Sequence, residues 1–308
     1  MKANTLSFYE AIVTDAAAHI VEHLDDALDL ATLARQAALS PLHFHRIFRG
    51  MLGETTIELQ RRLRLERAAV ALSTGSEPIT RIAFQAGYET HEAFTRAFRL
   101  IFAVPPTEFR QLSKAELEGC ARPPQVEVAA ANGIHFTATM VPRLLSEGST
   151  NMEVVIKELE PMRVATVTHV GPYSRISEAF GRLGAIAGPS GLYQDPLAAM
   201  IAVYHDDTDS VPADELRSDA GLVVSNGRTL PRGLGELHIA GGRYACAIHR
   251  GAYSQLGDTW AQLMGHWLPG SGQRAKDGAA FEIYRNTPEN TPVSELITEL
   301  YMPITDEP

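Results

Sequence analysis

Two stretches of this chain follow one pattern, LARQAALSPLHFHRIFR at residues 33–49 and IAFQAGYETHEAFTRAFR at residues 82–99. Their matched positions lie fifty residues apart: Phe44 and Phe94, Arg46 and Arg96, Phe48 and Phe98, Arg49 and Arg99. In each stretch a short apolar helix is followed by a turn and by a second helix whose aromatic residues fall on one face, which is typical of a helix-turn-helix. Two such units in one chain can reach two turns of a DNA groove without a dimer.

A longer helix is predicted between the two stretches, over residues 56–73. Thr55 and Glu58 form the capping-box pattern that opens a helix, and Gly75-Ser76-Glu77-Pro78 ends it. Its core residues are expected to be Leu59, Leu63 and Ala69. A solvated or phosphate-facing surface is expected for Arg61, Arg62 and Arg67. At about 1.5 Å per residue, this helix can space the two units by roughly one turn of DNA.

Charge is unevenly divided along the chain. The formal net charge is −10, but residues 1–112 carry 12 basic and 13 acidic residues, whereas residues 113–308 carry 15 and 24. Between Arg46 and Arg110 there are ten arginines, seven acidic residues and no lysine. DNA contact depends on the local field. The overall acidity therefore does not exclude a DNA-binding first half.

Composition bounds the class of protein. With 308 residues, 45% of them hydrophobic, the chain is long enough for two domains with separate cores. No apolar run approaches the roughly 18 residues of a membrane span, and the first residues do not read as a signal peptide. Cys120 and Cys246 stand outside any CxxC motif, which suits a reducing compartment. A cytoplasmic protein without membrane contact is expected.

A wider set of positions runs through the first 112 residues. It comprises Ala31-x-Leu33-Ala34, Ser40-Pro41, Phe44-x-Arg46-x-Phe48, Arg64-x-x-x-Ala68, Ile79-x-x-Ile82-Ala83, Gly87-Tyr88, Phe94-x-x-x-Phe98 and Pro105-Pro106-x-x-Phe109-Arg110. With these residues the block resembles the AraC/XylS family of bacterial transcription regulators, in which the second helix of each unit enters the major groove. Ala103 departs from the family, which usually has glycine there, and this bears on the local backbone.

The resemblance implies two DNA-reading faces. The first consists of Leu42, His43, His45, Arg46 and Arg49, and the second of His91, Glu92, Thr95, Arg96 and Arg99. Arg46 and Arg96 are the best candidates for base contacts, because a bidentate arginine–guanine pair discriminates by about 1–3 kcal/mol. Arg49 and Arg99 follow core aromatics, and two roles stay open for them: a base contact, or a phosphate contact that positions the helix without specifying sequence. Because the two faces differ, an asymmetric operator is expected.

No metal or cofactor is expected. His43 and His45 are two residues apart on a helix and point about 200° apart, so they cannot share an ion. Asp25, Asp26 and Asp29 lack the glycine-containing loop of a calcium site and are interpreted as a helix end and turn.

Residues 113–150 are predicted to be a linker, because Pro123-Pro124, Asn132-Gly133 and Gly148-Ser149 interrupt regular structure. Within it, residues 135–141 alternate in apolar character, and two alternatives stay open for them: a short strand or part of the linker.

Residues 151–308 contain an internal repeat with an offset of eighty. The matched pairs are Arg163 and Arg243, Ala165 and Ala245, His169 and His249, Gly171 and Gly251, Tyr173 and Tyr253, Ser174 and Ser254, Leu183 and Leu263, Tyr204 and Tyr284, and Leu216 and Leu296. Each half is predicted as strand, turn, helix and two strands, with a cleft between the halves. The predicted strands are 163–170, 200–205 and 220–225, then 243–249, 281–285 and 296–302. Ser174 and Ser254 are expected to cap the helices.

The most specific motifs of this half are His169-x-Gly171-x-Tyr173, Gly241-Gly242-x-Tyr244, His249-x-Gly251-x-Tyr253 and the run from Phe281 to Pro303. They resemble the GyrI-like small-molecule-binding domains attached to some AraC regulators. The resemblance implies a cleft lined by aromatic residues and one acidic residue. The predicted effector-binding residues are Glu282, Tyr284, Trp260, Tyr204 and Tyr301.

Glu282 is the preferred acidic residue of this cleft. In a strand it shares a face with Tyr284, and its equivalent in the first half is Ala202. A carboxylate present in only one of two repeats is not required by the fold. Beside aromatic rings it favours a cationic or polarised lipophilic effector. Glu299 is the competing acid.

The expected fold class is α+β in two domains. Residues 1–112 form an all-α double helix-turn-helix, and residues 151–308 form the duplicated strand–helix–strand–strand effector domain. The expected function is a sequence-specific DNA-binding transcription regulator, with double-stranded DNA, a small effector and RNA polymerase as partners. Two alternatives for the C-terminal domain stay open: hydrolysis of an electrophilic toxin with Glu282 as base, and sequestration of a toxin or protein partner. No Ser/His/Asp triad or metal-ligand spacing appears, so no catalytic residue is assigned.

Overall fold

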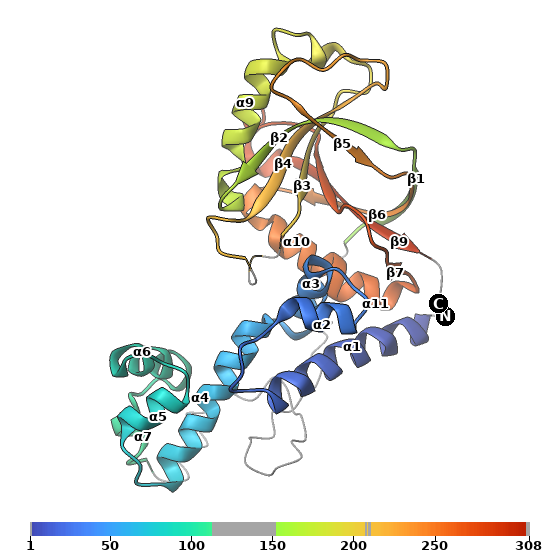
Figure 1. Ribbon diagram of the computed structural model, residues 1–308. Coiled ribbons are helices and arrows are strands. Elements are labelled where there is room, and N and C mark those ends of the chain that lie inside the picture. Colours follow the sequence, from blue (N-terminus) through green and yellow to red (C-terminus); the bar gives the residue numbers. More distant parts are fainter. Residues whose placement is uncertain (1, 113–151, 207, 209–210, 306–308) are drawn as a thin grey trace. The chain divides into compact units, whose positions relative to one another are not determined.

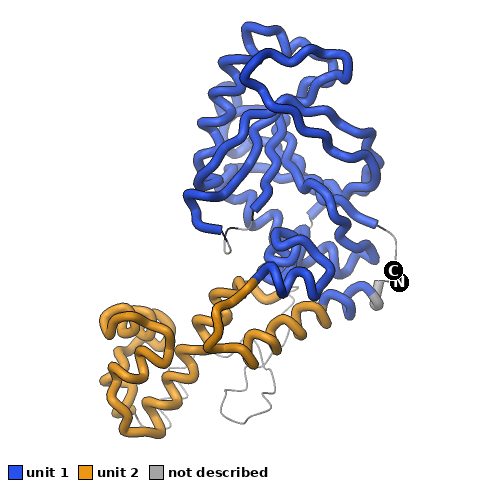
Figure 2. Tube along the Cα trace, in the orientation of Figure 1, with its two compact units in different colours: residues 1–9, 30–50, 145–308 blue, residues 10–29, 51–144 orange. Residues whose placement is uncertain are grey.

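A computed structural model describes residues 2–112, 152–206, 208 and 211–305. The predicted linker over 113–150, with its open strand, lies outside the described residues. The chain divides into two compact units, one of residues 1–9, 30–50 and 145–308 and the other of residues 10–29 and 51–144 (Figure 2). The first helix-turn-helix therefore belongs to the unit that contains the C-terminal domain, and the second belongs to the other unit.

The chain up to residue 112 is helical (Figure 1). The helices are α1 (Lys2–Glu22), α2 (Leu30–Gln36), α3 (Pro41–Leu52), α4 (Thr56–Thr74), α5 (Ile79–Gln85), α6 (His91–Phe102) and α7 (Pro106–Phe109). The pairs α2–α3 and α5–α6 fall on the two quoted stretches. This confirms both predicted helix-turn-helix units.

The long helix α4 begins where its cap predicts. The Thr55 amide donates to Glu58 Oε2 at 2.8 Å, and the Glu58 amide donates to Thr55 Oγ1 at 3.2 Å. This reciprocal capping box satisfies two amides that a helix start leaves without partners. The predicted core residues Leu59, Leu63 and Ala69 are buried.

The core around α5 and α6 is built from aromatic rings. Phe98 lies at the centre of this core, with ring centroids 4.4 Å from Phe102, 5.2 Å from Phe109 and 5.5 Å from Phe94. Helical spacing places Phe94, Phe98 and Phe102 on one face of α6. The opposite face of α6 is left for solvent or a partner.

The C-terminal part is a curled antiparallel sheet with helices. Its strands are β1 (Val154–Leu159), β2 (Met162–Val170), β3 (Met200–Tyr204), β4 (Arg217–Val224), β5 (Gly235–Ile239), β6 (Gly242–Arg250), β7 (Arg274–Ala275), β8 (Phe281–Tyr284) and β9 (Ile297–Thr305). Its helices are α9 (Ser177–Ala187), α10 (Leu256–Gln262), a π-helix (Leu263–Trp267) and α11 (Leu268–Ser271). Short 3₁₀ turns comprise Tyr173–Arg175, Leu192–Gln194, Tyr253–Gln255 and Val293–Glu295. All six predicted strands are present, and the two-domain α+β class is confirmed.

The two repeats exchange their first strands. The sheet order is β1-β6-β9-β8-β3-β4-β2-β5, and β7 pairs with β9. Strand β1 thus pairs with β6 of the second half, and β5 pairs with β2 of the first half. The order is symmetric about the central pair β3–β8, and the offset of eighty maps each of the eight strands in this order onto its counterpart; β7 has none. Ala202 pairs with Glu282 at this centre.

The two faces of the sheet carry different side chains. One face carries an apolar cluster that includes Ile201, Val203, Tyr244, Phe281 and Tyr301. On the other face α9 packs against β2 and β4, through residues such as Leu183 and Leu222. Alternation along β8 therefore turns Glu282 and Tyr284 away from Phe281 and towards the helices.

The prediction that Ser174 and Ser254 cap the helices is wrong. Both serines lie inside the 3₁₀ turns that precede α9 and α10. The N-cap positions are Ile176 and Gln255, and neither makes a side-chain cap hydrogen bond. The 3₁₀ turns bring the chain into each helix without a capping side chain.

Candidate functional site

The second reading face lies on α6 and is open to solvent. Thr90 caps the helix by accepting a hydrogen bond from the Ala93 amide at 3.1 Å. Of the predicted reading residues, Glu92, Arg96 and Arg99 are exposed and His91 and Thr95 are half-buried. The amphipathic pattern of α6 therefore holds its aromatic rings inside and presents two arginines outward.

The first reading face, on α3, has a different environment. Arg49 is exposed and Leu42 and Arg46 are half-buried, but His43 and His45 retain only 2% and 5% exposure. Burial, and after it the charge of Arg46, lowers the pKa of His43 to about 4, so this imidazole is neutral at neutral pH. The two histidines of the α3 face are thus buried, whereas none of the five predicted reading residues of α6 is.

The expectation of a solvated surface is wrong for Arg62. This side chain is buried and lies between two acids, with its guanidinium 2.7 Å from both Glu54 and Glu66. Arg61, its neighbour in sequence, is exposed as expected. Arg62 therefore belongs to a buried ion network that ties Glu54, just before α4, to the first half of that helix.

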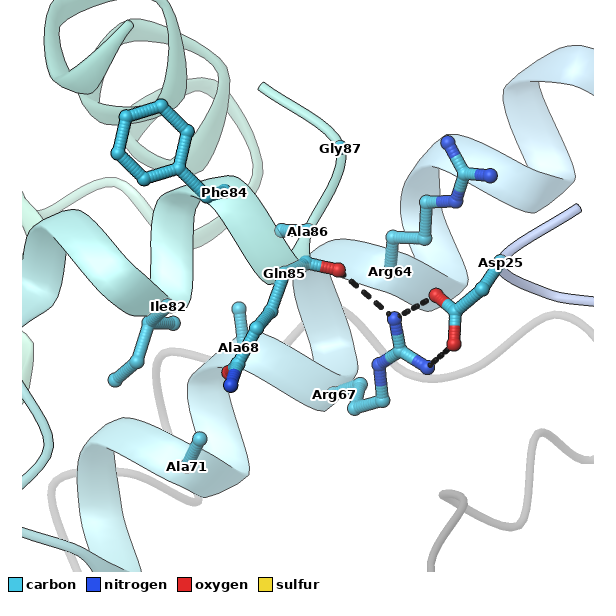
Figure 3. Close-up of a pocket in the computed structure, with 10 residues that line it drawn as sticks. All are labelled: Asp25, Arg64, Arg67, Ala68, Ala71, Ile82, Phe84, Gln85, Ala86 and Gly87. Atoms are coloured by element: carbon cyan, nitrogen blue, oxygen red, sulfur yellow. Dashed lines mark hydrogen bonds and ion pairs between the residues drawn. The ribbon is translucent and has the colours of Figure 1, made fainter. Parts of the chain in front are cut away.

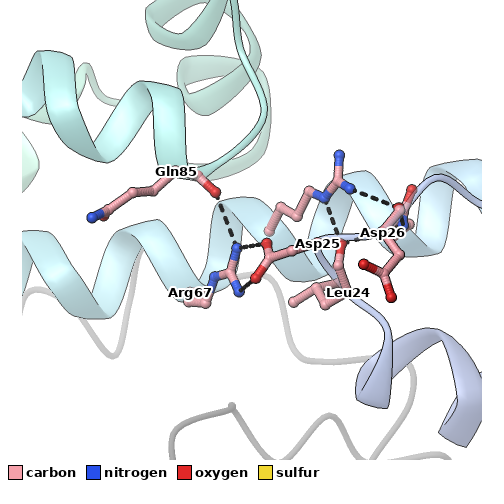
Figure 4. A network of polar contacts seen from close by, with 7 residues as sticks. Leu24, Asp25, Asp26, Arg67 and Gln85 are labelled. Atoms are coloured by element: carbon pink, nitrogen blue, oxygen red, sulfur yellow. Dashed lines mark hydrogen bonds and ion pairs between the residues drawn. The ribbon is translucent and has the colours of Figure 1, made fainter.

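Two further arginines of α4 line a cleft of about 610 Å³ between α4 and α5 (Figure 3). Arg67 pairs with the Asp25 carboxylate and donates to the Gln85 carbonyl at 3.0 Å (Figure 4). Arg64 donates to the Leu24 carbonyl at 2.7 Å. Both side chains fasten the segment after α1 to α4, which fits the interpretation of Asp25 as part of a turn.

Glu282 forms the centre of the candidate effector site. Only 2% of this residue is exposed. Its Oε1 accepts a hydrogen bond from Trp260 Nε1 at 2.8 Å, and its Oε2 accepts from the Tyr284 hydroxyl at 2.7 Å and the Tyr204 hydroxyl at 3.2 Å. The structure therefore brings together four of the five predicted effector residues.

Tyr204 and Tyr284 donate hydrogen bonds to Glu282 because both phenols stay protonated. Burial, and then the charge of Glu282, raises the pKa of Tyr204 and of Tyr284 well above the usual phenol range. Both phenols therefore stay protonated and keep their hydrogen bonds to the carboxylate.

Three more rings surround these residues and were missed in the sequence. Phe180 lies edge-on to Tyr284 with centroids 5.6 Å apart, Tyr253 contacts Tyr284 at 5.2 Å, and Tyr173 contacts Tyr204 at 4.8 Å. The offset of eighty could have found them, since Phe180 is the equivalent of Trp260. We call Glu282 with Trp260, Tyr204, Tyr284, Tyr173, Tyr253 and Phe180 the Glu282 cage.

The position of Glu282 explains why only one repeat carries the acid. Glu282 and Ala202 are direct partners across the central strand pair. Two carboxylates placed opposite each other would have Cβ atoms about 5 Å apart and would repel. The cage is therefore nearly symmetric in its rings and asymmetric in its charge.

Tyr301 and Glu299 do not join the cage. The Tyr301 ring stacks on Phe281 at 4.8 Å, on the other face of the sheet. Glu299 accepts hydrogen bonds from Arg285 and from Tyr301, and Lys157 lies 3.3 Å away. Burial alone would raise the pKa of Glu299, but these contacts outweigh it and lower the pKa to about 2. This acid is already neutralised by two cations.

The described residues contain neither a cluster of metal ligands nor a membrane-spanning helix. No three His, Cys, Asp or Glu side chains in that part of the chain gather as a metal would require. No helix there has the length and apolar character needed to cross a membrane.

Two helix-turn-helix units are typical of a DNA-binding transcription regulator, and in this chain they are joined to a duplicated antiparallel sheet domain. Matches to known protein families support the same class. Residues 33–112 match a helix-turn-helix domain, and residues 152–305 match the GyrI-like small molecule binding domain. The chain belongs to the GyrI-like family, in the form in which that domain is joined to an AraC-type DNA-binding domain.

Individual relatives match one half or the other. Regulatory protein SoxS of Escherichia coli (strain K12) is 34% identical over 102 residues, which are 33% of this chain and 95% of SoxS. The transcriptional regulator Rob of Salmonella typhimurium is 34% identical over 113 residues, 37% of this chain and 39% of Rob. A DNA gyrase inhibitor of Yersinia enterocolitica is 31% identical over 141 residues, 44% of this chain and 87% of that protein.

Among solved structures, the C-terminal domain of EcmrR overlaps 51% of this chain and 99% of that domain, with 18% identity and a TM-score of 0.41.

Proposed function

We propose that the Glu282 cage binds a lipophilic cation, and that this effector controls how the regulator binds its operator. The observation that carries the proposal is the buried Glu282 carboxylate, to which three neutral groups donate hydrogen bonds. A buried charge costs free energy that a bound cation offsets. Ring faces around the carboxylate add cation–π attraction.

Calorimetry with two ions of the same shape and opposite charge tests the cage. Tetraphenylphosphonium is expected to bind the full chain, and tetraphenylborate is expected not to bind. Glu282→Gln keeps the shape of the side chain and removes its charge, and we expect tetraphenylphosphonium affinity to fall by about tenfold or more, since a charge pair shielded from water is worth more than about 1.4 kcal/mol.

Glu299→Gln is the matched control, because Glu299 is likewise an acid on a strand of this sheet but is already paired with Arg285. Its cation affinity should equal that of the unmodified chain. Equal affinity of the Glu282→Gln variant, or equal binding of both ions, would remove Glu282 as the charge partner.

The operator is part of the same proposal. The side chains of α3 and α6 differ, which supports an asymmetric DNA site. Selection from random DNA would define that site, and its positions in the genome would indicate the regulated genes. RNA polymerase, the further partner implied by the resemblance, is tested by transcription in vitro from a selected site.

The hydrolase alternative has less support from the cage. A general base must be within reach of the proton that it takes, and both oxygens of Glu282 already accept hydrogen bonds. That arrangement suits a counter-ion. Turnover of an electrophilic substrate by the 151–308 fragment would favour the enzyme instead.

A further inference from the structure

A cation already lies against the Glu282 cage, and it comes from the first helix-turn-helix. The Arg46 guanidinium of α3 lies 4.0 Å from the centre of the Trp260 ring. Trp260 in turn donates its Nε1 hydrogen to Glu282. The charge of Arg46 also acts on Tyr204, whose pKa is raised by burial and by Glu282 and is lowered by Arg46. Arg46 thus contacts the Trp260 ring of the cage, and its charge lowers the pKa of a second member, Tyr204.

The contact continues beyond this one side chain. The end of α3 approaches the π-helix through two glycines: a Cβ added to Gly50 would lie 2.5 Å from the Ala261 carbonyl oxygen and 2.6 Å from Gly265 Cα. No side chain fits between backbones at that distance. The Ala275 amide donates to the buried Tyr9 hydroxyl at 2.9 Å, and the Arg274 guanidinium lies 3.9 Å from the Phe8 ring centre. All these residues belong to one compact unit.

We propose that Arg46 is an internal occupant of the effector site, so that the ligand-binding domain holds the first reading helix until a cationic effector replaces Arg46. This inference rests on the proposed function of the Glu282 cage as a cation site. In this arrangement α3 docks on the surface formed by α10 and the π-helix. The same arginine therefore has two competing positions, on the Trp260 ring or on DNA.

The direction of the coupling follows from the contact. While α3 is docked, His43 and His45 of its reading face are closed to water and so to DNA. A cation that takes the place of Arg46 favours the released state, and DNA favours it too. Two ligands that prefer the same state strengthen each other's binding by one common factor. The effector is therefore an inducer of DNA binding by the first unit.

The first test measures tetraphenylphosphonium binding to the full chain with Arg46→Met, which removes the competing charge and keeps an apolar stem. If the docked state outnumbers the released state tenfold, the apparent affinity rises about tenfold. Arg96→Met is the matched control, since it removes the equivalent arginine of the second unit, and its cation affinity should stay unchanged. Unchanged affinity with Arg46→Met would overturn the inference.

The second test measures DNA binding and uses no effector. A Cβ on Gly265 would overlap the backbone of Gly50, so Gly265→Ala should loosen the docked state and tighten binding to the selected operator several-fold. Gly257→Ala is the control, because its Cβ would meet nothing within 4 Å. Tyr9→Phe removes the acceptor for the Ala275 amide and offers a milder variant, expected to act in the same direction if Gly265→Ala does not fold.

The two proposals fail in different ways. If Glu282→Gln binds the cation as tightly as the unmodified chain, the cation site itself is wrong, and the DNA measurement still decides whether α3 docks. If Glu282 is required but Arg46→Met and Gly265→Ala change nothing, the site stands and the internal occupant is refuted. An operator affinity that the cation lowers would also refute it.

Discussion

Ala103 ends helix α6 in a left-handed conformation, with φ 65° and ψ −12°. Its amide donates to the Arg99 carbonyl at 2.9 Å, which closes the last turn of the helix. For a residue with a Cβ this conformation costs roughly 1–2 kcal/mol. The alanine that departs from the family pattern is thus held in the backbone that glycine adopts without strain.

Ala103→Gly is therefore expected to raise the free energy of unfolding by about 0.5–1 kcal/mol, because the strain relieved exceeds the added entropy of glycine in the unfolded chain. Urea unfolding of the full chain, followed by far-ultraviolet circular dichroism, measures it. The reverse change serves as control: Gly87 has φ +82°, and a Cβ there would lie 2.8 Å from the Arg64 guanidinium, so Gly87→Ala should destabilise. A loss of stability with Ala103→Gly would contradict the account.

The sequence predicts the position of some site residues and not of others. Glu282, Tyr284 and Tyr204 could be predicted to meet, because alternation and the repeat fix which face of a strand they share. Tyr301 could not be placed in the same way, since its face depends on the register of β9 opposite Phe281. His43 was expected on a DNA-reading face, but it is buried, and the helical spacing of α3 alone did not indicate this.

Helix α4 is held by a buried ion network in its first half. Arg62 bonds to Glu54 with Nε at 3.0 Å and Nη2 at 2.7 Å, and to Glu66 with Nη1 at 2.7 Å. Burial raises the pKa of Glu66 despite the arginine beside it. Arg62 is the one cation of this network, so its loss would leave two buried carboxylates without a counter-charge.

Arg62→Met should lower the free energy of unfolding by about 3 kcal/mol, because it leaves two buried carboxylates without their partner. The control is Arg61→Met, one residue earlier and exposed, which should change stability by less than about 0.5 kcal/mol. Thermal and urea unfolding would compare the two. Similar small effects of both changes would show that the network adds nothing to stability.

Helix α6 presents its arginines to solvent, so its contribution to DNA binding can be tested separately from α3. Arg96→Ala is expected to weaken binding to a selected operator by about 1–3 kcal/mol, or roughly 5-fold to 150-fold, and to relax the preference at one base pair. Fluorescence anisotropy at fixed salt measures the affinity, and the cation binding proposed for the Glu282 cage should be the same in this variant as in the unmodified chain. Undiminished operator affinity would remove Arg96 from the reading face.

Sequence patterns predict the buried strands of the C-terminal domain but not its exposed edge strands. The six strands predicted from the repeat have buried runs, as in β4 and β6. Strands β1 and β5 were missed because they are mostly exposed edge strands and lack a regular apolar alternation. Each also pairs with the opposite repeat, which no local pattern records.

At the scale of the molecule, the exchange of β1 and β5 makes the two repeats depend on each other. Strand β1 has its partner in the second half, and β3 has β8 as one neighbour. A chain cut after Leu234 keeps β1, β2, β3 and β4 but loses the partners of β1 and the outer edge of β2. We expect residues 152–234 of such a chain to be digested rapidly in limited proteolysis, whereas residues 152–305 of the full chain resist. A protected first half would contradict the exchange.

The exchanged strands also set the order in which the domain can be completed during synthesis. Val154 of β1 pairs with Ala247 of β6, so about 90 residues must be translated after β1 before its partner exists. At 5–20 residues per second this is a wait of about 5–20 s on the ribosome. During that interval the newly made β1 has an unpaired backbone, which makes the nascent first repeat a natural client for chaperones.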